Sequence, residues 1–279
     1  RPVCLSDSRY TLQVKGQVHA DLFQLRHVIE QPAENFLSHQ MSAGGKLGYD
    51  PWHFTEGRLE KLAKACKKTG SKLVPVESNP IDAIWEDQPP PPLAPAVPHP
   101  MKFAGEESAD KRRRIGKALT KDGVNAVVLT APDSIAWLLN VRGGDVPNTP
   151  LPLSFAVLHH TGQMDWFIDD AKVDGTLTEH LGKDVRTHPT DEFGPGLDSL
   201  TGKTIQADAK ATAAWVFNRL EAAEANIVRH TDPCQLPKAI KNDVELAGTR
   251  AAHIRDGAAL TNFLGWLAAE APKGGIDEM

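Results

Sequence analysis

The sequence predicts an α/β protein built from mixed sheets that are covered by helices. Three observations carry this prediction. Short apolar runs typical of strands alternate with amphipathic helical runs along most of the chain. The order strand, helix, strand, Asx-Pro occurs at 45–80 and again at 202–233, which indicates two related α/β units in tandem. A proline-rich run at 89–100 separates the two units.

Composition and charge exclude several classes of protein. The chain has 279 residues, of which 41% are hydrophobic and 24% charged, as in a soluble globular protein with room for about two domains. A net charge of −5 provides no general attraction to nucleic acid, and no apolar run has the length of a membrane span. The one dense basic run, 111–114, has helical spacing and is predicted to be a solvated helix face. Three distant cysteines without a CxxC pair indicate reduced thiols in a cytosol.

The first unit is predicted as follows. Residues 7–10, Asp-Ser-Arg-Tyr, form a turn that enters a strand. Residues 45–50 and 72–76 form strands on either side of a helix at 56–68. The side chains expected on one face of that helix are Leu59, Leu62, Ala63 and Cys66. The following run, PPPPLAPAVPHP, holds seven of the 21 prolines and is either a stiff spacer or an SH3-type ligand; its position between globular segments favours a spacer.

The second unit opens on a buried strand at 122–130, after which Asp133 is expected to cap the helix at 134–140. Residues 154–160 and 163–169 predict a hairpin. Adjacent strand residues point to opposite faces, so His159 and His160 are expected to be structural and not to bind one metal together.

The last element is a long helix. Asn242 and Glu245 have the spacing of a capping box, and the helical pattern continues to Pro272, a length of roughly 40 Å at about 1.5 Å per residue. Its apolar face would need a large surface to cover it. We expect this helix to open a third domain that lies outside the sequence, although packing on the second unit is the alternative. The apolar positions are Ala247, Ala251, Ile254, Ala258, Phe263, Leu264 and Leu267.

No complete active site is predicted. The chain has no HExxH metal motif, GxSxG elbow, Walker motif or GxGxxG, so neither catalytic nor metal-binding residues are assigned. Two places are candidates for ligand contact. Arg9 could clamp a carboxylate or carbonyl, or could simply pair with Asp7. In the loop of 142–150, Gly143-Gly144 allows positive φ. The loop is expected to project Arg142, Asp145 and Asn148, although a turn in which Asp145 and Arg142 bond to the backbone is the alternative.

Three motifs in order then resemble the cytosolic Xaa-Pro aminopeptidases of the creatinase/prolidase/aminopeptidase P group: DSRYTLQ at 7–13, IAWLLNVRGGDVPNTPL at 135–151 and the helix at 241–267. The resemblance implies two tandem creatinase-like mixed-sheet α/β units, the first incomplete, followed by the opening helix of a pita-bread domain. The expected divisions are 1–88, a linker at 89–101, 102–238, and 239–279 for the start of the catalytic domain.

The resemblance also implies an activity. An intact enzyme of this kind removes the N-terminal residue from short peptides with proline in second position, as a cytoplasmic homodimer with two divalent ions, usually manganese, held by two Asp, one His and two Glu beyond this sequence. The family's Asp-Gly-Arg-Tyr motif falls on 7–10 with Ser8 in place of glycine, which makes Arg9 a substrate contact; Arg142 and Asp145 would lie at the channel mouth. This portion is expected to be inactive alone. The alternative is a stand-alone, non-catalytic creatinase-like module for binding or oligomerisation.

Overall fold

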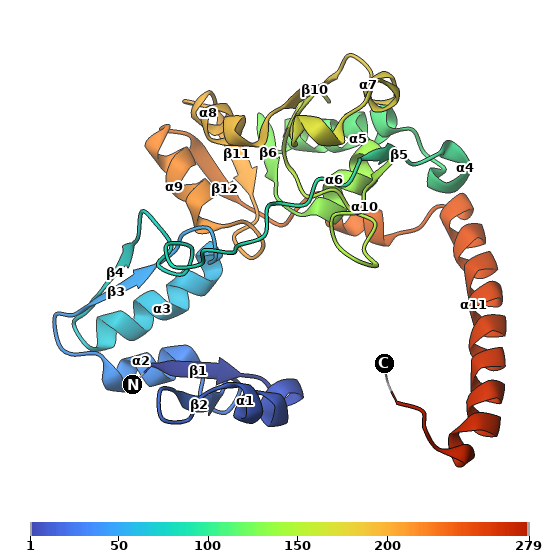
Figure 1. Cartoon of the computed structure of the whole chain (residues 1–279). Helices are drawn as coiled ribbons and strands as arrows, with labels where there is room; N and C mark the ends of the chain where they lie inside the picture. The colour runs from blue at the N-terminus through green and yellow to red at the C-terminus, as the bar shows by residue number, and fades with distance from the viewer. Residues whose placement is uncertain (1, 278–279) are drawn as a thin grey trace.

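The computed structural model describes residues 2–277 and confirms a mixed α/β fold (Figure 1). The N-terminal part contains two separate sheets, each a pair of parallel strands in register. The sheets are β1 (Val3–Ser6) with β2 (Gln24–His27), and β3 (Lys46–Tyr49) with β4 (Lys72–Pro75). The helices are η1 (Ser8–Tyr10), α1 (Thr11–Gln17), α2 (Ala33–Gln40) and α3 (Glu56–Lys68).

Two predictions for this part need correction. Residues 7–10 do not enter a strand. Asp7 caps the short helix η1 by accepting from the Arg9 backbone N–H, and the chain then continues as α1. Helix α3 has the predicted bounds, but Ala65 and not Ala63 joins its buried face. Residue 65 lies about one turn after Leu62, so the buried face of the helix is rotated slightly from the predicted one.

The second part is built on one six-stranded mixed sheet with the order β10-β9-β8-β6-β11-β12. Strand β8 runs antiparallel to β6 and β9, and the other neighbours are parallel. This confirms the predicted hairpin and the fully buried first strand. The bounds are β6 (Ala126–Leu129), β8 (Phe155–His159), β9 (Met164–Phe167), β10 (Val185–His188), β11 (Thr204–Ala207) and β12 (Asn226–Arg229).

Helices cover both faces of this sheet. One core lies under α5 (Ser108–Lys121), α6 (Pro132–Leu139) and α7 (Gly175–Leu181), and the other under α8 (Phe193–Asp198) and α9 (Ala214–Ala222). A short antiparallel pair joins β5 (Val97–Pro98) to β7 (Val141–Arg142), so the end of the proline-rich run is fastened to the second part. The remaining elements are α4 (Met101–Ala104), η2 (Asp170–Lys172), η3 (Thr190–Glu192), α10 (Gln235–Ala239) and η4 (Ala271–Lys273).

Asp133 does not cap its helix. Helix α6 begins two residues earlier than predicted, at Pro132, with Ala131 in the capping position. Proline favours the first helical position because its fixed φ is already helical and it has no N–H to satisfy. Asp133 therefore lies inside the first turn, where it forms an ion pair with Lys238 of α10.

The basic run at 111–114 was predicted to be a solvated helix face, but two of its four residues are buried. Lys111 and Arg112 are only 1% and 4% exposed, and they share the inner face of α5 with Ile115 and Leu119. Both cations have hydrogen-bond partners: Arg112 Nη1 donates to the Gly162 carbonyl at 2.6 Å. Burial of a charge is tolerated when such partners replace water.

The N-terminal and second parts meet through backbone and aromatic contacts. The Ala214 N–H donates to the Phe54 carbonyl at 2.8 Å. The rings of Trp52 and Trp215 stack with centroids 4.1 Å apart. An ion pair between Arg229 and Glu56 lies beside them. These contacts connect α3 and its preceding loop to the β11-α9-β12 region.

Helix α11 (Asp243–Glu270) leaves the second part and extends away from it (Figure 1). The capping box of Asn242 and Glu245 is confirmed, but no residue of the helix is buried. The predicted apolar stripe is wrong, because the large apolar side chains are distributed around the helix. Residues 257–269 carry no charge at all. Across residues 2–277, no helix is both long and apolar enough to span a membrane.

The stability of the fold is expected to depend on pH through Asp165 on β9. It lies 2.8 Å from His159 Nε2 on β8 and 3.1 Å from His188 Nε2 on β10, which confirms a structural role for His159. The hydrogen bond from His159, followed by that from His188, lowers the pKa of Asp165, although partial burial opposes this. The ionised carboxylate therefore stabilises the fold fully above its ordinary pKa of 3.8, and this stability is lost as the pH falls through the lower folded value.

Replacing Asp165 by asparagine should lower the free energy of unfolding by about 1.5–3 kcal/mol at pH 6, the usual range for hydrogen bonds to a charged group. At pH 3 the difference between the two proteins should shrink, because the unfolded carboxyl, with its ordinary pKa of 3.8, then binds a proton more readily than the folded one. Urea unfolding of both proteins at the two pH values measures this. An equal difference at both would mean that the charge of Asp165 does not matter.

Candidate functional site

Arg9 is displayed at the protein surface by a rigid turn. Asp7 caps η1 through the Arg9 backbone and also pairs with the Arg9 guanidinium, with Nη2 2.6 Å from Oδ2. These hydrogen bonds from Arg9 lower the pKa of Asp7, which stays ionised. The Arg9 side chain is still 76% exposed, so most of its donors face outward. Arg9 thus forms the surface ion pair with Asp7 that the sequence analysis gave as an alternative. The guanidinium can still bind an additional group.

The loop of 140–150 is shaped by residues other than those expected. Gly143 and Gly144 do not have positive φ; Asn140 and Asn148 do, and Asn140 ends helix α6. Gly143 is required for another reason, since a Cβ there would lie 2.6 Å from the Pro152 backbone nitrogen. The loop is therefore folded tightly against the segment that leads to β8.

Asp145 points into the protein and does not project from the loop, which corrects the prediction. Its side chain is fully buried and lies 2.7 Å from Lys172 Nζ, itself 5% exposed. The carboxylate also accepts from the backbone N–H groups of Leu153 at 2.6 Å and Ala94 at 3.2 Å. Asp145 thus connects the loop to η2 and to the middle of the proline-rich run. This is the alternative that the sequence had left open, in which Asp145 binds backbone groups.

Arg142 lines a hollow of about 640 Å³ between the loop, α10 and the first turns of α11. It is half-buried and donates to the Val141 carbonyl at 2.9 Å. Four cationic residues line the hollow, against the two carboxylates of Asp133 and Glu245, so its surface favours anionic or carbonyl-bearing groups. The cations are Arg142, Lys238, Lys241 and Arg255.

A buried cation beside this hollow was missed from the sequence. Lys111 Nζ lies 4.5 Å from the Trp137 ring centroid, and it donates to the Trp137 carbonyl at 3.0 Å and to Asn140 Oδ1 at 2.8 Å. Burial lowers the pKa of Lys111 to about 8, although Glu245 and Glu106 oppose the shift. The helical spacing of Lys111 with Ile115 and Leu119 is the signal that could have identified it.

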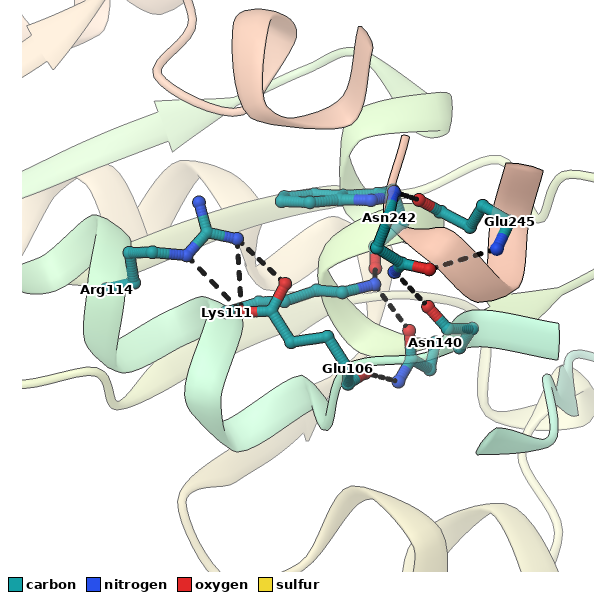
Figure 2. A network of polar contacts seen from close by, with 8 residues as sticks. Glu106, Lys111, Arg114, Asn140, Asn242 and Glu245 are labelled. Carbon is teal, nitrogen blue, oxygen red and sulfur yellow. Dashed lines mark hydrogen bonds and ion pairs between the residues drawn. The ribbon is translucent and has the colours of Figure 1, made fainter. Parts of the chain in front are cut away.

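Figure 2 shows this network joining the second part to α11. Asn140 Nδ2 donates to the Glu106 carbonyl at 2.8 Å, and Asn242 Nδ2 donates to the Ala104 carbonyl at 2.8 Å. Gly105 adopts a left-handed φ of 71°, and a Cβ there would lie 2.5 Å from Asn242 Oδ1. The start of α11 is thus held in one place, directly beside Arg142.

Of the three residues predicted for a ligand site, only Arg142 lines the hollow beside α11. Arg9 and Asp145 lie elsewhere. Within residues 2–277, no group of three or more His, Cys, Asp or Glu side chains could hold a metal ion.

Residues 87–245 match the family described as the creatinase/prolidase N-terminal domain. The chain belongs to this family. The match begins before the proline-rich run, includes the whole six-stranded sheet, and ends at the capping box of α11. Creatinase-like α/β architecture is therefore confirmed for the part that carries Arg142 and the buried Lys111.

Relatives extend the likeness beyond the matched domain. A probable Xaa-Pro aminopeptidase P of Aspergillus clavatus is 34% identical over 98% of this chain and 44% of its own length. One from Coccidioides posadasii is 34% identical over 95% of this chain and 42% of its own. The chain thus spans less than half the length of these relatives.

A solved structure has the same fold over nearly the whole chain. The X-prolyl aminopeptidase of Caenorhabditis elegans, described as a cytosolic enzyme with a di-nuclear active site, superposes with a TM-score of 0.86 at 27% identity. The likeness covers 98% of this chain and 46% of that one. Helix α11 and the N-terminal part are thus included in the resemblance.

Proposed function

We propose that this chain is the N-terminal portion of a metal-dependent Xaa-Pro aminopeptidase, which releases the N-terminal residue from peptides with proline in second position. The observation that carries the proposal is the match of 98% of the chain to a relative so named. The whole activity requires more polypeptide than this, because that match covers 44% of the relative. We assign the two metal ions, manganese by preference, to ligands in a further domain.

Helix α11 supports the presence of such a domain. Its uncharged segment 257–269 exposes Phe263, Leu264 and Trp266, each with about half of its surface in solvent. A helix that is apolar on all sides is normally buried. In our proposal the catalytic domain packs around α11, and the network at Asn242 orients the helix relative to the second part.

The roles of this portion are to restrict entry of substrate and to support a cytoplasmic homodimer. Arg142 would lie at the mouth of the channel, where its guanidinium can donate to a peptide carbonyl or carboxylate. Arg9 would contact the peptide itself, because only its Nε and Nη2 groups donate to Asp7 and its side chain is 76% exposed. We propose the division into 1–88, 89–101, 102–238 and 239–279 that the family resemblance implies.

An assay of two proteins tests the proposal. The peptide Ala-Pro-Ala is incubated with MnCl2 and either residues 1–279 or the longer protein from the same gene, and free alanine is measured. The longer protein should release alanine and lose this activity with EDTA, whereas residues 1–279 should not release it. Chelator-sensitive release by residues 1–279 would contradict our placement of the metal site. No release by the longer protein would favour the non-catalytic module.

A further inference from the structure

Positive charge is concentrated at the end of the hollow that Arg142 lines. Burial lowers the pKa of Lys111 to about 8, and it also lowers the pKa of Arg142 and of His99, which lines the same hollow. The charges of Arg142 and Lys111 lower the pKa of His99 further. Glu245 opposes the shift in all three groups, and Glu106 opposes it in Lys111. The protein therefore does not fully compensate the positive charge at this place.

The two carboxylates of the hollow already have partners. Asp133 forms its ion pair with Lys238. Glu245 Oε2 accepts from the Asn242 backbone N–H at 3.0 Å, as part of the capping box of α11. Neither carboxylate forms an ion pair with Arg142 among the residues that the structure describes.

Three cations of the hollow thus have no counter-charge in contact. Arg142 donates only to the Val141 carbonyl, and Lys241 Nζ donates to the Lys238 carbonyl at 2.6 Å. Within residues 2–277 the Arg255 side chain has neither a hydrogen bond nor an ion pair, although it lines the hollow. An anion in the hollow would be attracted by all three, and a carboxylate can accept two parallel hydrogen bonds from a guanidinium.

The basic groups are held in place beside an apolar wall. Arg142 pairs with Val97 across β7 and β5, and the His99 N–H donates to the Asn140 carbonyl at 2.7 Å. The His99 ring stacks on Phe103 with centroids 5.7 Å apart. The volume of about 640 Å³ is in the range of sites for small ligands, about 300–1,000 Å³. The apolar lining residues are Phe103, Trp137, Pro150 and Leu151.

We propose that this hollow binds the C-terminal carboxylate of a short peptide, with Arg142 as the principal donor. A C-terminal residue carries its carboxylate and its side chain on the same Cα, so it can reach the cations and the apolar wall together. An acidic side chain within a peptide supplies the charge without an apolar group beside it. The proposal rests on the proposed function and names the end of the substrate that this portion recognises.

Three peptides test the site on residues 1–279, with the His99 ring followed by NMR. Ala-Pro-Ala should raise the pKa of His99, because it brings a negative charge close to the ring. It should bind about 10-fold more tightly than Ala-Pro-Ala-amide, the effect of one hydrogen bond between charged groups. Ala-Pro-Glu-amide should bind as weakly as Ala-Pro-Ala-amide.

Three outcomes of this titration would overturn the proposal. Equal binding of Ala-Pro-Ala and its amide would show that the terminal carboxylate is not recognised. Binding of Ala-Pro-Glu-amide as tight as that of Ala-Pro-Ala would assign the hollow to acidic side chains. Absence of binding by all three peptides would show that the hollow is not a peptide site.

Variants identify the donors. Arg142→Gln should remove the preference for the acid over the amide, whereas Arg113→Gln, which removes an exposed cation of α5, should keep it. Arg255→Gln removes an exposed cation of the hollow and should reduce the preference by about 2–5-fold. This second variant decides the matter if circular dichroism shows that Arg142→Gln does not fold. An undiminished preference in Arg142→Gln, or in Arg255→Gln where only that variant folds, would overturn the proposal.

Kinetics of the longer protein separate this inference from the proposed function. Arg142→Gln should raise KM for Ala-Pro-Ala about 10-fold with kcat nearly unchanged, and should leave KM for the amide as it was. Equal changes of KM for the two peptides would contradict recognition of the carboxylate. If the longer protein cleaves neither peptide, the proposed function fails, whereas the titration of residues 1–279 still measures the carboxylate site.

Discussion

Replacing Asp145 by alanine is expected to lower the free energy of unfolding by about 3–5 kcal/mol, the usual cost of removing one partner from a buried ion pair. The Lys172 ammonium would be left 5% exposed without a counter-charge. The backbone N–H groups of Leu153 and Ala94 would also lose their acceptor. Urea unfolding followed by circular dichroism measures the loss.

Asp198→Ala is the matched control, because Asp198 pairs with Arg219 at the surface, where both side chains are more than a third exposed. An exposed pair contributes only about 0–1 kcal/mol. If Asp145→Ala and Asp198→Ala cost the same, the buried pair is not the stabilising contact that the structure indicates.

Asp145→Ala should also make the proline-rich run more mobile. Ala94 donates to Asp145, and Ala96 donates to the Lys172 carbonyl at 2.9 Å, so both partners of the ion pair hold this segment. Limited proteolysis between 89 and 96 should therefore be faster in Asp145→Ala than in Asp198→Ala. This outcome would show that the loop of 140–150 and the run before β5 form one structural unit.

Replacing Arg9 by alanine in the longer protein is expected to lower kcat/KM for Xaa-Pro peptides by about 10–100-fold, the effect of losing one or two hydrogen bonds from a charged donor. The prediction rests on the proposed function. Tm should change little, because the Arg9 side chain is 76% exposed and contacts Asp7 alone among charged groups. Arg9→Lys should restore only part of the activity, since an ammonium cannot donate in the fork geometry of a guanidinium.

Arg113→Ala is the control for charge, because Arg113 also forms an exposed ion pair with a nearby aspartate, Asp110 on α5. It should leave kcat/KM unchanged. Unchanged kinetics of Arg9→Ala on peptides of several lengths would reduce Arg9 to a surface ion pair. A fall in Tm with Arg9→Ala would instead indicate that the turn of 7–10 stabilises the fold.

Local signals in the sequence determined much of the fold. The start of α11 was predictable because a capping box needs only Asn242 and Glu245, three residues apart. The hairpin of β8 and β9 and the bounds of α3 were predictable from periodicity and turn residues over short distances. The family also followed from short motifs in order, and the match over 87–245 confirms it.

The tertiary structure alone decided which charges are buried. Lys111 and Asp145 resemble surface residues in the sequence, because their partners Asn140 and Lys172 lie 29 and 27 positions away. Burial of a charge depends on a partner that compensates for lost water, and such partners are brought together only when the chain folds. For the same reason the sequence suggested that Asp145 and Arg142 share one site, whereas the fold directs Asp145 into the core and leaves Arg142 beside α11.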